Sequence, residues 1–205
     1  MTTGNLPNRP LSRKLAGQSA RQSARQSADI TGQSVLQGGP TFWVAGHRQH
    51  HAFTEHLEKD PYSAKKGFWW SHMLWMFYLK PEVFDRKVFS KNAPDIARDP
   101  YYAFLDKYFL ALQVPLALGL YALGGWSFVI YGVFVRAVTL WHCTWLINSA
   151  NHLWGYRHFD SDDIARNLWW VALLTYGEGW HNNHHTFPKM AKAGLTIWEI
   201  DPTWW

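Results

Sequence analysis

The segment YFLALQVPLALGLYAL-GG-WSFVIYGVFVRAVTLWHCTWLI, residues 108–147, decides the fold of this chain. Its first 16 residues carry no charge and would extend about 24 Å as a helix. The 22 residues after the glycine pair would extend about 33 Å, and about 20 apolar residues suffice to cross a bilayer. We therefore expect a transmembrane hairpin that turns at Gly124 and Gly125, with a kink at Pro115 in its first, shorter arm. A buried hairpin of a soluble protein is the alternative.

The positive charges around this segment predict its orientation. Nine Lys and Arg residues lie between positions 59 and 107, Arg157 and Arg166 follow the segment, and its turn carries none. Cytoplasmic loops of membrane proteins are enriched in Lys and Arg, so we expect both ends of the hairpin to face the cytoplasm. Arg136, within the second arm, should point into the protein or a polar cavity rather than towards lipid.

The overall composition agrees with a membrane protein and argues against a nucleic-acid-binding one. Charged residues make up 17% of the 205-residue chain, and there are 14 Trp, a residue that is enriched at membrane interfaces. The net charge is +5, but the Lys and Arg are scattered and form no nucleic-acid-binding motif. A single cysteine, Cys143, excludes a disulfide within the chain.

The first 35 residues differ from the rest of the chain. Residues 17–28 read GQSA-RQSA-RQSA, a polar repeat with almost nothing to bury, so we expect residues 1–35 to be a disordered, low-complexity tail. Its basic, acid-poor composition resembles that of an organelle transit peptide. A mis-called or rearranged gene start is an equal alternative. Residues 36–205 are then the single folded domain.

Two histidine motifs with the same spacing flank the apolar segment, HRQHH at 47–51 and HNNHH at 181–185. On a helix, positions i, i+3 and i+4 share one face, so each motif can direct its imidazoles towards one point. Imidazole suits iron, zinc, copper and nickel. The segment NSANH at 148–152 adds an asparagine and a histidine four residues apart. Zinc-protease, zinc-finger and phosphate-loop motifs are absent, and the single Glu-x-x-His at 178–181 lacks the partners of a carboxylate-bridged di-iron bundle.

Several longer stretches resemble the membrane-bound, di-iron fatty acyl desaturases, and in particular the cyanobacterial acyl-lipid enzymes that desaturate at carbon 9. The resemblance covers about residues 36–205. Its most specific stretch is GEGWHNNHH, and the full set is QGGP at 37–40, FWVA at 42–45, DP at 60–61, GFWWSHM at 67–73, NSA at 148–150, GEGWHNNHH at 177–185 and WEID at 198–201.

The resemblance implies an all-α, multi-pass integral membrane protein with a transmembrane hairpin and a cytosolic helical cap that carries the histidine boxes. It implies that seven histidines are ligands of two irons: His47, His50, His51, His152, His181, His184 and His185. Asn148 would hold one iron through a water, and Gln37, Trp43 and Thr144 would line the bend of an acyl tunnel. No catalytic residue is expected beyond the metal ligands, which would lie on the cytoplasmic side.

The implied reaction introduces a cis double bond, at carbon 9, into a lipid- or CoA-linked acyl chain. It uses two Fe2+ ions, O2 as co-substrate, and electrons from ferredoxin or cytochrome b5. The C–H bonds of adjacent methylenes have no acidity that a side chain can exploit, so the metal must carry the difficult step.

The sequence also departs from the family pattern. The family's first box, HxxxxH, and the hairpin before it belong upstream of Gln37, relatives continue past Trp205, and Glu55-His56 replaces the more usual residues after the second box. We therefore expect a chain truncated at its N-terminus, shortened at its C-terminus, and inactive or nearly so on its own. An inactive remnant that at most binds metal or membrane, and a related histidine-box hydroxylase, are the alternative functions.

Overall fold

The computed structural model of the protein describes residues 38–78 and 86–204, so the tail of residues 1–35 and Gln37 lie outside it. Within these ranges the chain is helical and has no strand, only two isolated bridges that join Tyr156 to Asn167 and Asn167 to Trp180. The all-α prediction is confirmed for this part of the chain. Its helical elements are α3 (Pro40–Phe53), η1 (Ala64–Lys66), α4 (Phe68–His72), η2 (Leu74–Tyr78), α5 (Arg86–Phe89), α6 (Pro94–Ala97), α7 (Pro100–Tyr108), α8 (Gln113–Val129), the π-helical η4 (Ile130–Val135), α9 (Arg136–Leu153), α10 (Trp169–Leu174) and α11 (His181–Thr186).

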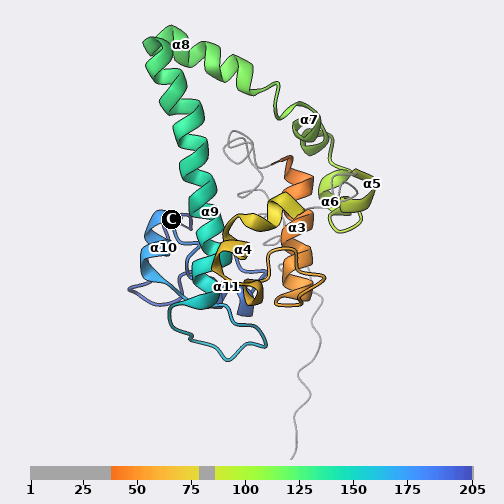
Figure 1. Cartoon of the computed structure of the whole chain (residues 1–205), viewed down its shortest axis with the longest axis vertical. Coiled ribbons are helices and arrows are strands. Elements are labelled where there is room, and N and C mark those ends of the chain that lie inside the picture. Colours follow the sequence, from red (N-terminus) through yellow and green to blue (C-terminus); the bar gives the residue numbers. More distant parts are fainter. Residues whose placement is uncertain (1–37, 79–85, 205) are drawn as a thin grey trace, which may run out of the picture.

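The apolar segment forms the long arm of the molecule, from α8 through η4 into α9 (Figure 1). The backbone angles of Gly124 and Gly125 are not helical, and Gly125 has a φ of 64°, which favours glycine. The predicted break at this glycine pair is therefore confirmed. A Cβ on Gly132 would lie only 2.7 Å from Leu120 Cδ1, so the part of α8 before the bend packs closely against η4.

The predicted kink at Pro115 is wrong. α8 begins at Gln113 rather than at residue 108, and its non-helical angles are confined to Gly124 and Gly125. Pro115 is thus the third residue of the helix, where its missing N–H would have had no partner within the helix. Tyr108, the start of the expected first arm, is instead the last residue of α7, and the chain turns between the end of α7 and the start of α8.

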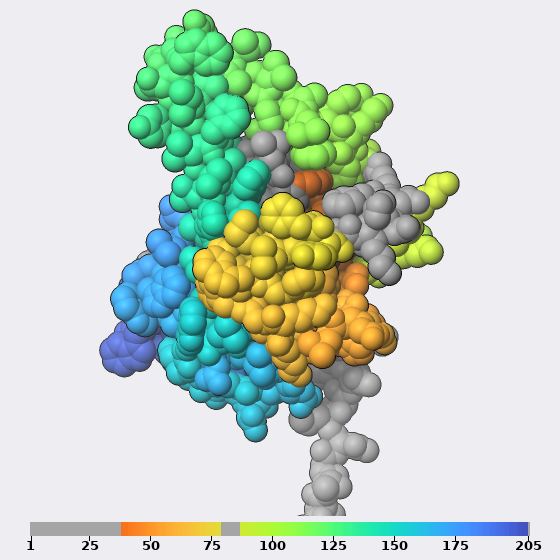
Figure 2. Space-filling model, in the orientation of Figure 1, coloured from red at the N-terminus to blue at the C-terminus, as the bar shows by residue number. Residues whose placement is uncertain are grey.

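By length and composition, residues Gln113–Leu153 are one candidate membrane-spanning helix, and an 18-residue window within it has a mean hydropathy of 1.7. Most apolar side chains of α8 and η4 are exposed, and Figure 2 shows these two elements projecting beyond the rest of the molecule. An apolar surface of this extent requires a partner, either lipid or protein. This arm does not establish two separate membrane-spanning helices, so the transmembrane hairpin remains a proposal.

Helices α3, α4, α10 and α11 gather at the lower half of α9, and α5, α6 and α7 pack against α3 on the side away from α9; together they form a cap (Figure 1). One apolar cluster joins α3 to α6 and α7 through Val44, Ile96 and Leu105, and a second joins α9 to α10 through Ala150 and Val171. The first cluster fixes α3, which carries the first histidine motif, and the second fixes the end of α9 that carries His152.

The start of α3 is fixed by a residue that lies far away in the sequence. Gly39, its N-cap, offers no side chain, and the Asp106 carboxylate on α7 instead accepts hydrogen bonds from Thr41 N, at 3.0 Å, and from the Thr41 hydroxyl. Gly39 is required here, because a Cβ would lie 2.3 Å from Asp106 Oδ1. This contact fixes the start of the helix that carries the first histidine motif.

Candidate metal centre

The seven predicted ligands come from three helices, and the structure brings all of them together. HRQHH lies in the second half of α3, His152 near the end of α9, and HNNHH forms most of α11. Their ligand nitrogens fall into two groups, and within each group all of them lie within 4.8 Å of one another. The first group, called the four-histidine group, is His50, His152, His181 and His185, and the second, called the three-histidine group, is His47, His51 and His184.

Each motif contributes to both groups, but in opposite proportions. On α3, the middle histidine, His50, belongs to the four-histidine group, and His47 and His51 belong to the three-histidine group. On α11, only the middle histidine, His184, belongs to the three-histidine group, and the other two belong to the four-histidine group. Identical spacing therefore leads to complementary roles, because the two helices approach the centre from different sides.

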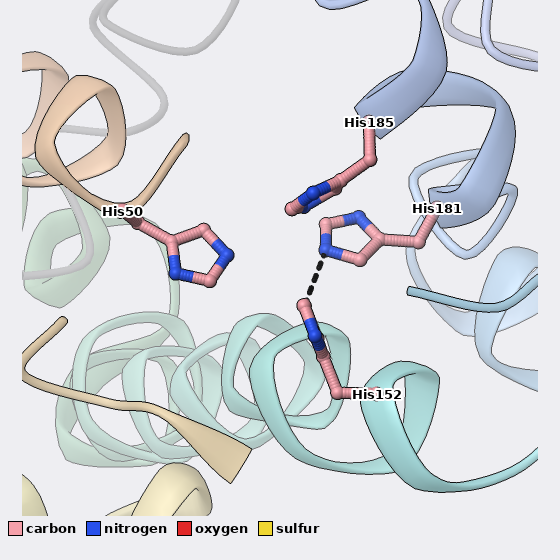
Figure 3. Close-up of side chains that lie close together, drawn as sticks. All are labelled: His50, His152, His181 and His185. Atoms are coloured by element: carbon pink, nitrogen blue, oxygen red, sulfur yellow. Dashed lines mark hydrogen bonds between the residues drawn. The ribbon is translucent and has the colours of Figure 1, made fainter. Parts of the chain in front are cut away.

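The rings of the four-histidine group converge on one buried point (Figure 3). The Nε2 atoms of His152 and His181 are 3.1 Å apart, whereas the Nε2 atoms of His50 and His185 are buried without a hydrogen-bond partner. A buried polar atom without a partner costs about 1–3 kcal/mol. A cation at the point of convergence would remove this cost, so these residues fit a metal ion.

The three-histidine group is equally close but only partly buried. Its Nε2 atoms are 3.2 Å apart between His47 and His184, 3.1 Å between His51 and His47, and 3.0 Å between His51 and His184. One neutral imidazole carries a single N–H, so a triangle of three nitrogens cannot be satisfied by hydrogen bonds alone. Two nitrogens bound to one ion at about 2.0–2.1 Å are also about 3 Å apart when they occupy neighbouring positions. This spacing fits a second metal ion.

Three carboxylates orient the rings of the four-histidine group. His50 Nδ1 lies 3.0 Å from Asp60 Oδ2, His152 Nδ1 lies 2.8 Å from Glu55 Oε1, and His185 Nδ1 lies 2.7 Å from Asp163 Oδ2. A histidine that donates Nδ1–H to a carboxylate keeps its Nε2 lone pair for the metal and becomes a stronger ligand.

Sequence reasoning missed the role of these carboxylates. Glu55 was noted only as a departure from the family pattern, and Asp60 only as part of the resemblance. Their position four and nine residues after His51, on the loop that leaves the motif, was the available signal. Asp163 had no such signal, because it reaches His185 only through the folding of the loop after α9.

Burial keeps the imidazoles neutral. Burial and the neighbouring His152 lower the pKa of His50 to about 3, and burial with the neighbouring His185 lowers the pKa of His184 to about 3. Burial likewise lowers the pKa of His185 to about 4, although Asp163 acts in the opposite direction. The pKa values of His47, His51 and His181 are lowered for the same reason. At neutral pH all six rings are thus in the form that binds metal ions.

A network of hydrogen-bonded polar side chains holds α11 in place. The fully buried Asn167 donates to Asn183 Oδ1 at 2.9 Å and to Glu199 Oε1 at 3.2 Å, and its own Oδ1 accepts from Asn182 N at 2.9 Å. Asn182 in turn accepts from His158 N at 2.9 Å. The two asparagines of HNNHH therefore fix the helix that carries three ligands, a role that the motif alone did not reveal.

The other predicted site residues have mixed outcomes. Asn148 and Thr144 lie one and two turns before His152 on α9, and both are partly buried. The Thr144 hydroxyl donates to Leu140 O at 2.9 Å within the same helix. Trp43 lies one turn before His47 on α3 and packs against the Val44 cluster. Their contacts with water or an acyl chain stay predictions.

Comparison with known proteins agrees with this centre. The sequence profile of a family described as fatty acid desaturase matches residues 18–195. An sn-2 palmitoyl-lipid 9-desaturase of Nostoc sp. (strain 36) is 68% identical over 176 residues, which cover 86% of this chain and 62% of that protein. An sn-1 stearoyl-lipid 9-desaturase of Anabaena variabilis is 52% identical, over 85% of this chain and 63% of the relative. A chloroplastic palmitoyl-monogalactosyldiacylglycerol delta-7 desaturase of Arabidopsis thaliana is 44% identical, over 85% of this chain and 46% of the relative. This chain thus spans between 46% and 63% of the length of these three relatives.

Proposed function

This chain belongs to the fatty acid desaturase family, and we propose that it supplies the di-iron centre of an enzyme that introduces a cis double bond at carbon 9 of a fatty acyl chain. The observation that carries the proposal is the convergence of seven imidazoles into two groups, each of a size and spacing that fits one metal ion. Imidazole nitrogen alone does not distinguish iron from zinc or copper, so the choice of Fe2+ rests on the family. O2 is the proposed co-substrate, and ferredoxin or cytochrome b5 the proposed electron donor.

A pair of bound irons would activate O2, the proposed oxidant, so that it can break unactivated C–H bonds. The chain's own residues hold and orient this centre. Glu55, Asp60 and Asp163 fix the direction of three imidazoles, and the burial of the four-histidine group limits the access of bulk water to it. Asn148, on the α9 face of His152, is proposed to position a water at one of the irons.

The proposed substrate is a lipid-linked acyl chain, because the two bacterial relatives are named as acyl-lipid 9-desaturases. Gln37, Trp43 and Thr144 are proposed to line the acyl path. Trp43 lies one turn from His47 and Thr144 lies one turn from Asn148, and this proximity supports the proposal. Positioning of this kind determines which methylenes are oxidised.

The apolar arm is proposed to anchor the protein in the membrane as one hairpin of a multi-pass protein. The bend at Gly124 and Gly125, and the packing of Leu120 against Gly132, support a chain that turns within or near the far side of the bilayer. The excess of Lys and Arg before and after the arm supports a metal centre on the cytoplasmic side.

A chimeric enzyme tests this function. The matching 176-residue segment of the Nostoc relative is replaced by that of this chain, and the chimera is expressed with ferredoxin in a host without 9-desaturase activity. We expect cis-9 unsaturated acyl chains, measured as fatty acid methyl esters. A folded, membrane-inserted chimera that holds iron but yields only saturated chains would refute the proposal. Expression of the 205-residue chain alone in the same host tests whether it is active by itself.

A further inference from the structure

We propose that the two metal positions of this chain are unequal, so that the four-histidine group binds its ion first and more tightly than the three-histidine group. In this proposal Glu55, Asp60 and Asp163 are positioning residues that give the four-histidine group its advantage. The inference rests on the proposed metal-dependent function and adds an order of metal binding to it.

The first difference between the groups is the number and burial of their donors. The residues His50, His152 and His181 are each 2% exposed and His185 is 9% exposed, whereas all three residues of the other group are partly exposed. Within this chain the four-histidine group offers four nitrogens to an ion and the three-histidine group offers three. An ion at the partly exposed group would therefore gain less from binding and would exchange with water more readily.

The second difference is the orientation of the rings. Three of the four rings in the four-histidine group contact a carboxylate through Nδ1. Across residues 38–78 and 86–204, no ring of His47, His51 or His184 has a carboxylate hydrogen bond. An imidazole held in the correct tautomer and direction loses less entropy when it binds a metal. The four-histidine group is thus arranged for binding before the ion arrives.

One short loop provides two of the three carboxylates. Glu55 N donates to Asp60 Oδ2 at 3.1 Å, and Ser63 Oγ donates to Glu55 Oε2 at 3.1 Å. Glu55 has a φ of 65°, a conformation that non-glycine residues rarely adopt and that persists only when the surroundings impose it. The loop reaches α9 through Glu55 and α3 through Asp60, so it sets the position of His152 relative to His50 independently of any ion.

Cobalt titration of the detergent-solubilised 205-residue chain tests the proposal. Co2+ is the probe, because its visible absorption bands report the number and geometry of nitrogen ligands. We expect two phases, with one Co2+ per chain bound at least about 10-fold more tightly than the second. Replacement of a carboxylate that hydrogen-bonds a metal-binding histidine typically weakens metal binding by about 10- to 100-fold. Glu55→Gln should therefore weaken Co2+ binding in the first phase by that amount and shift the absorption bands of that phase.

Matched controls separate this effect from a change in surface charge. Glu58 lies on the same loop and Asp162 is the neighbour of Asp163, and both side chains are exposed. Glu58→Gln and Asp162→Asn should leave both phases unchanged, while Asp163→Asn should weaken the first. His47→Ala should remove the second phase and leave the first. If Glu55→Gln fails to fold, as judged by helical circular dichroism, Asp163→Asn carries the same prediction from a different loop.

Three results would overturn the inference. These are two phases of equal affinity, a His47→Ala variant that loses the tight phase, and carboxylate variants that bind like their exposed controls. Failure of the proposed function has a different signature, namely a folded chain that binds no Co2+ in either phase.

Discussion

Removal of the Asp106 carboxylate should destabilise the cap although Asp106 does not touch the metal centre. α3 has no side-chain cap of its own, and Asp106 receives both the N–H and the hydroxyl of Thr41, a residue with no exposed surface. Loss of an N-cap acceptor costs about 1 kcal/mol. Loss of the acceptor for a buried hydroxyl costs about 1–3 kcal/mol. We therefore expect Asp106→Ala to lower the free energy of unfolding by about 2–4 kcal/mol.

The measurement is guanidinium unfolding of the detergent-solubilised chain followed by tryptophan fluorescence, to which the 14 Trp contribute. Thr41→Ala removes only the hydroxyl bond and should cost about 1 kcal/mol. The double variant should cost less than the sum of the two single variants, because both remove one shared interaction. A loss below about 0.5 kcal/mol for Asp106→Ala, or full additivity in the double variant, would refute the assignment of Asp106 as the cap of α3.

Three further predictions concern the metal centre. In the chimera, His184→Ala should abolish desaturation without affecting membrane insertion, because it removes one of the nitrogens of the three-histidine group. Retained cis-9 products would contradict the ligand assignment. Thr144→Phe should change the chain length or position of the product more than the iron content, and an unchanged product profile in a folded protein would exclude Thr144 from the acyl path. The metal-free chain should lose stability as the pH falls from about 6.5 towards 4, because burial lowers the pKa values of His50 and His184 to about 3 and that of His185 to about 4. Over that interval the unfolded chain binds more protons than the folded one. Asp60, whose pKa burial raises to about 6, and Glu178, whose pKa is raised to about 7, oppose this trend, but they are two groups against six histidines with lowered pKa values. A denaturation midpoint that is constant between pH 7 and 4.5 would show that the rings are less buried than described.

The gathering of the seven histidines and the helical character of the described residues could be predicted from the sequence. Imidazole is a metal ligand wherever it lies, and the spacing of HRQHH and HNNHH places all members of each motif on one side of a helix. The break at Gly124 and Gly125 was equally predictable, since a glycine pair tolerates backbone angles that other residues avoid. These features are local, and local chemistry is enough to determine them.

Only the tertiary structure decided how the seven histidines divide between two positions. HRQHH and HNNHH have the same spacing, yet His50 joins His181 and His185 whereas His184 joins His47 and His51. The division depends on the direction from which α3 and α11 approach each other across α9, which no motif encodes. The same holds for Asp163 and for the capping of α3 by Asp106, because each joins residues that are distant along the chain. Long-range packing, rather than spacing, determines which imidazole belongs to which histidine group.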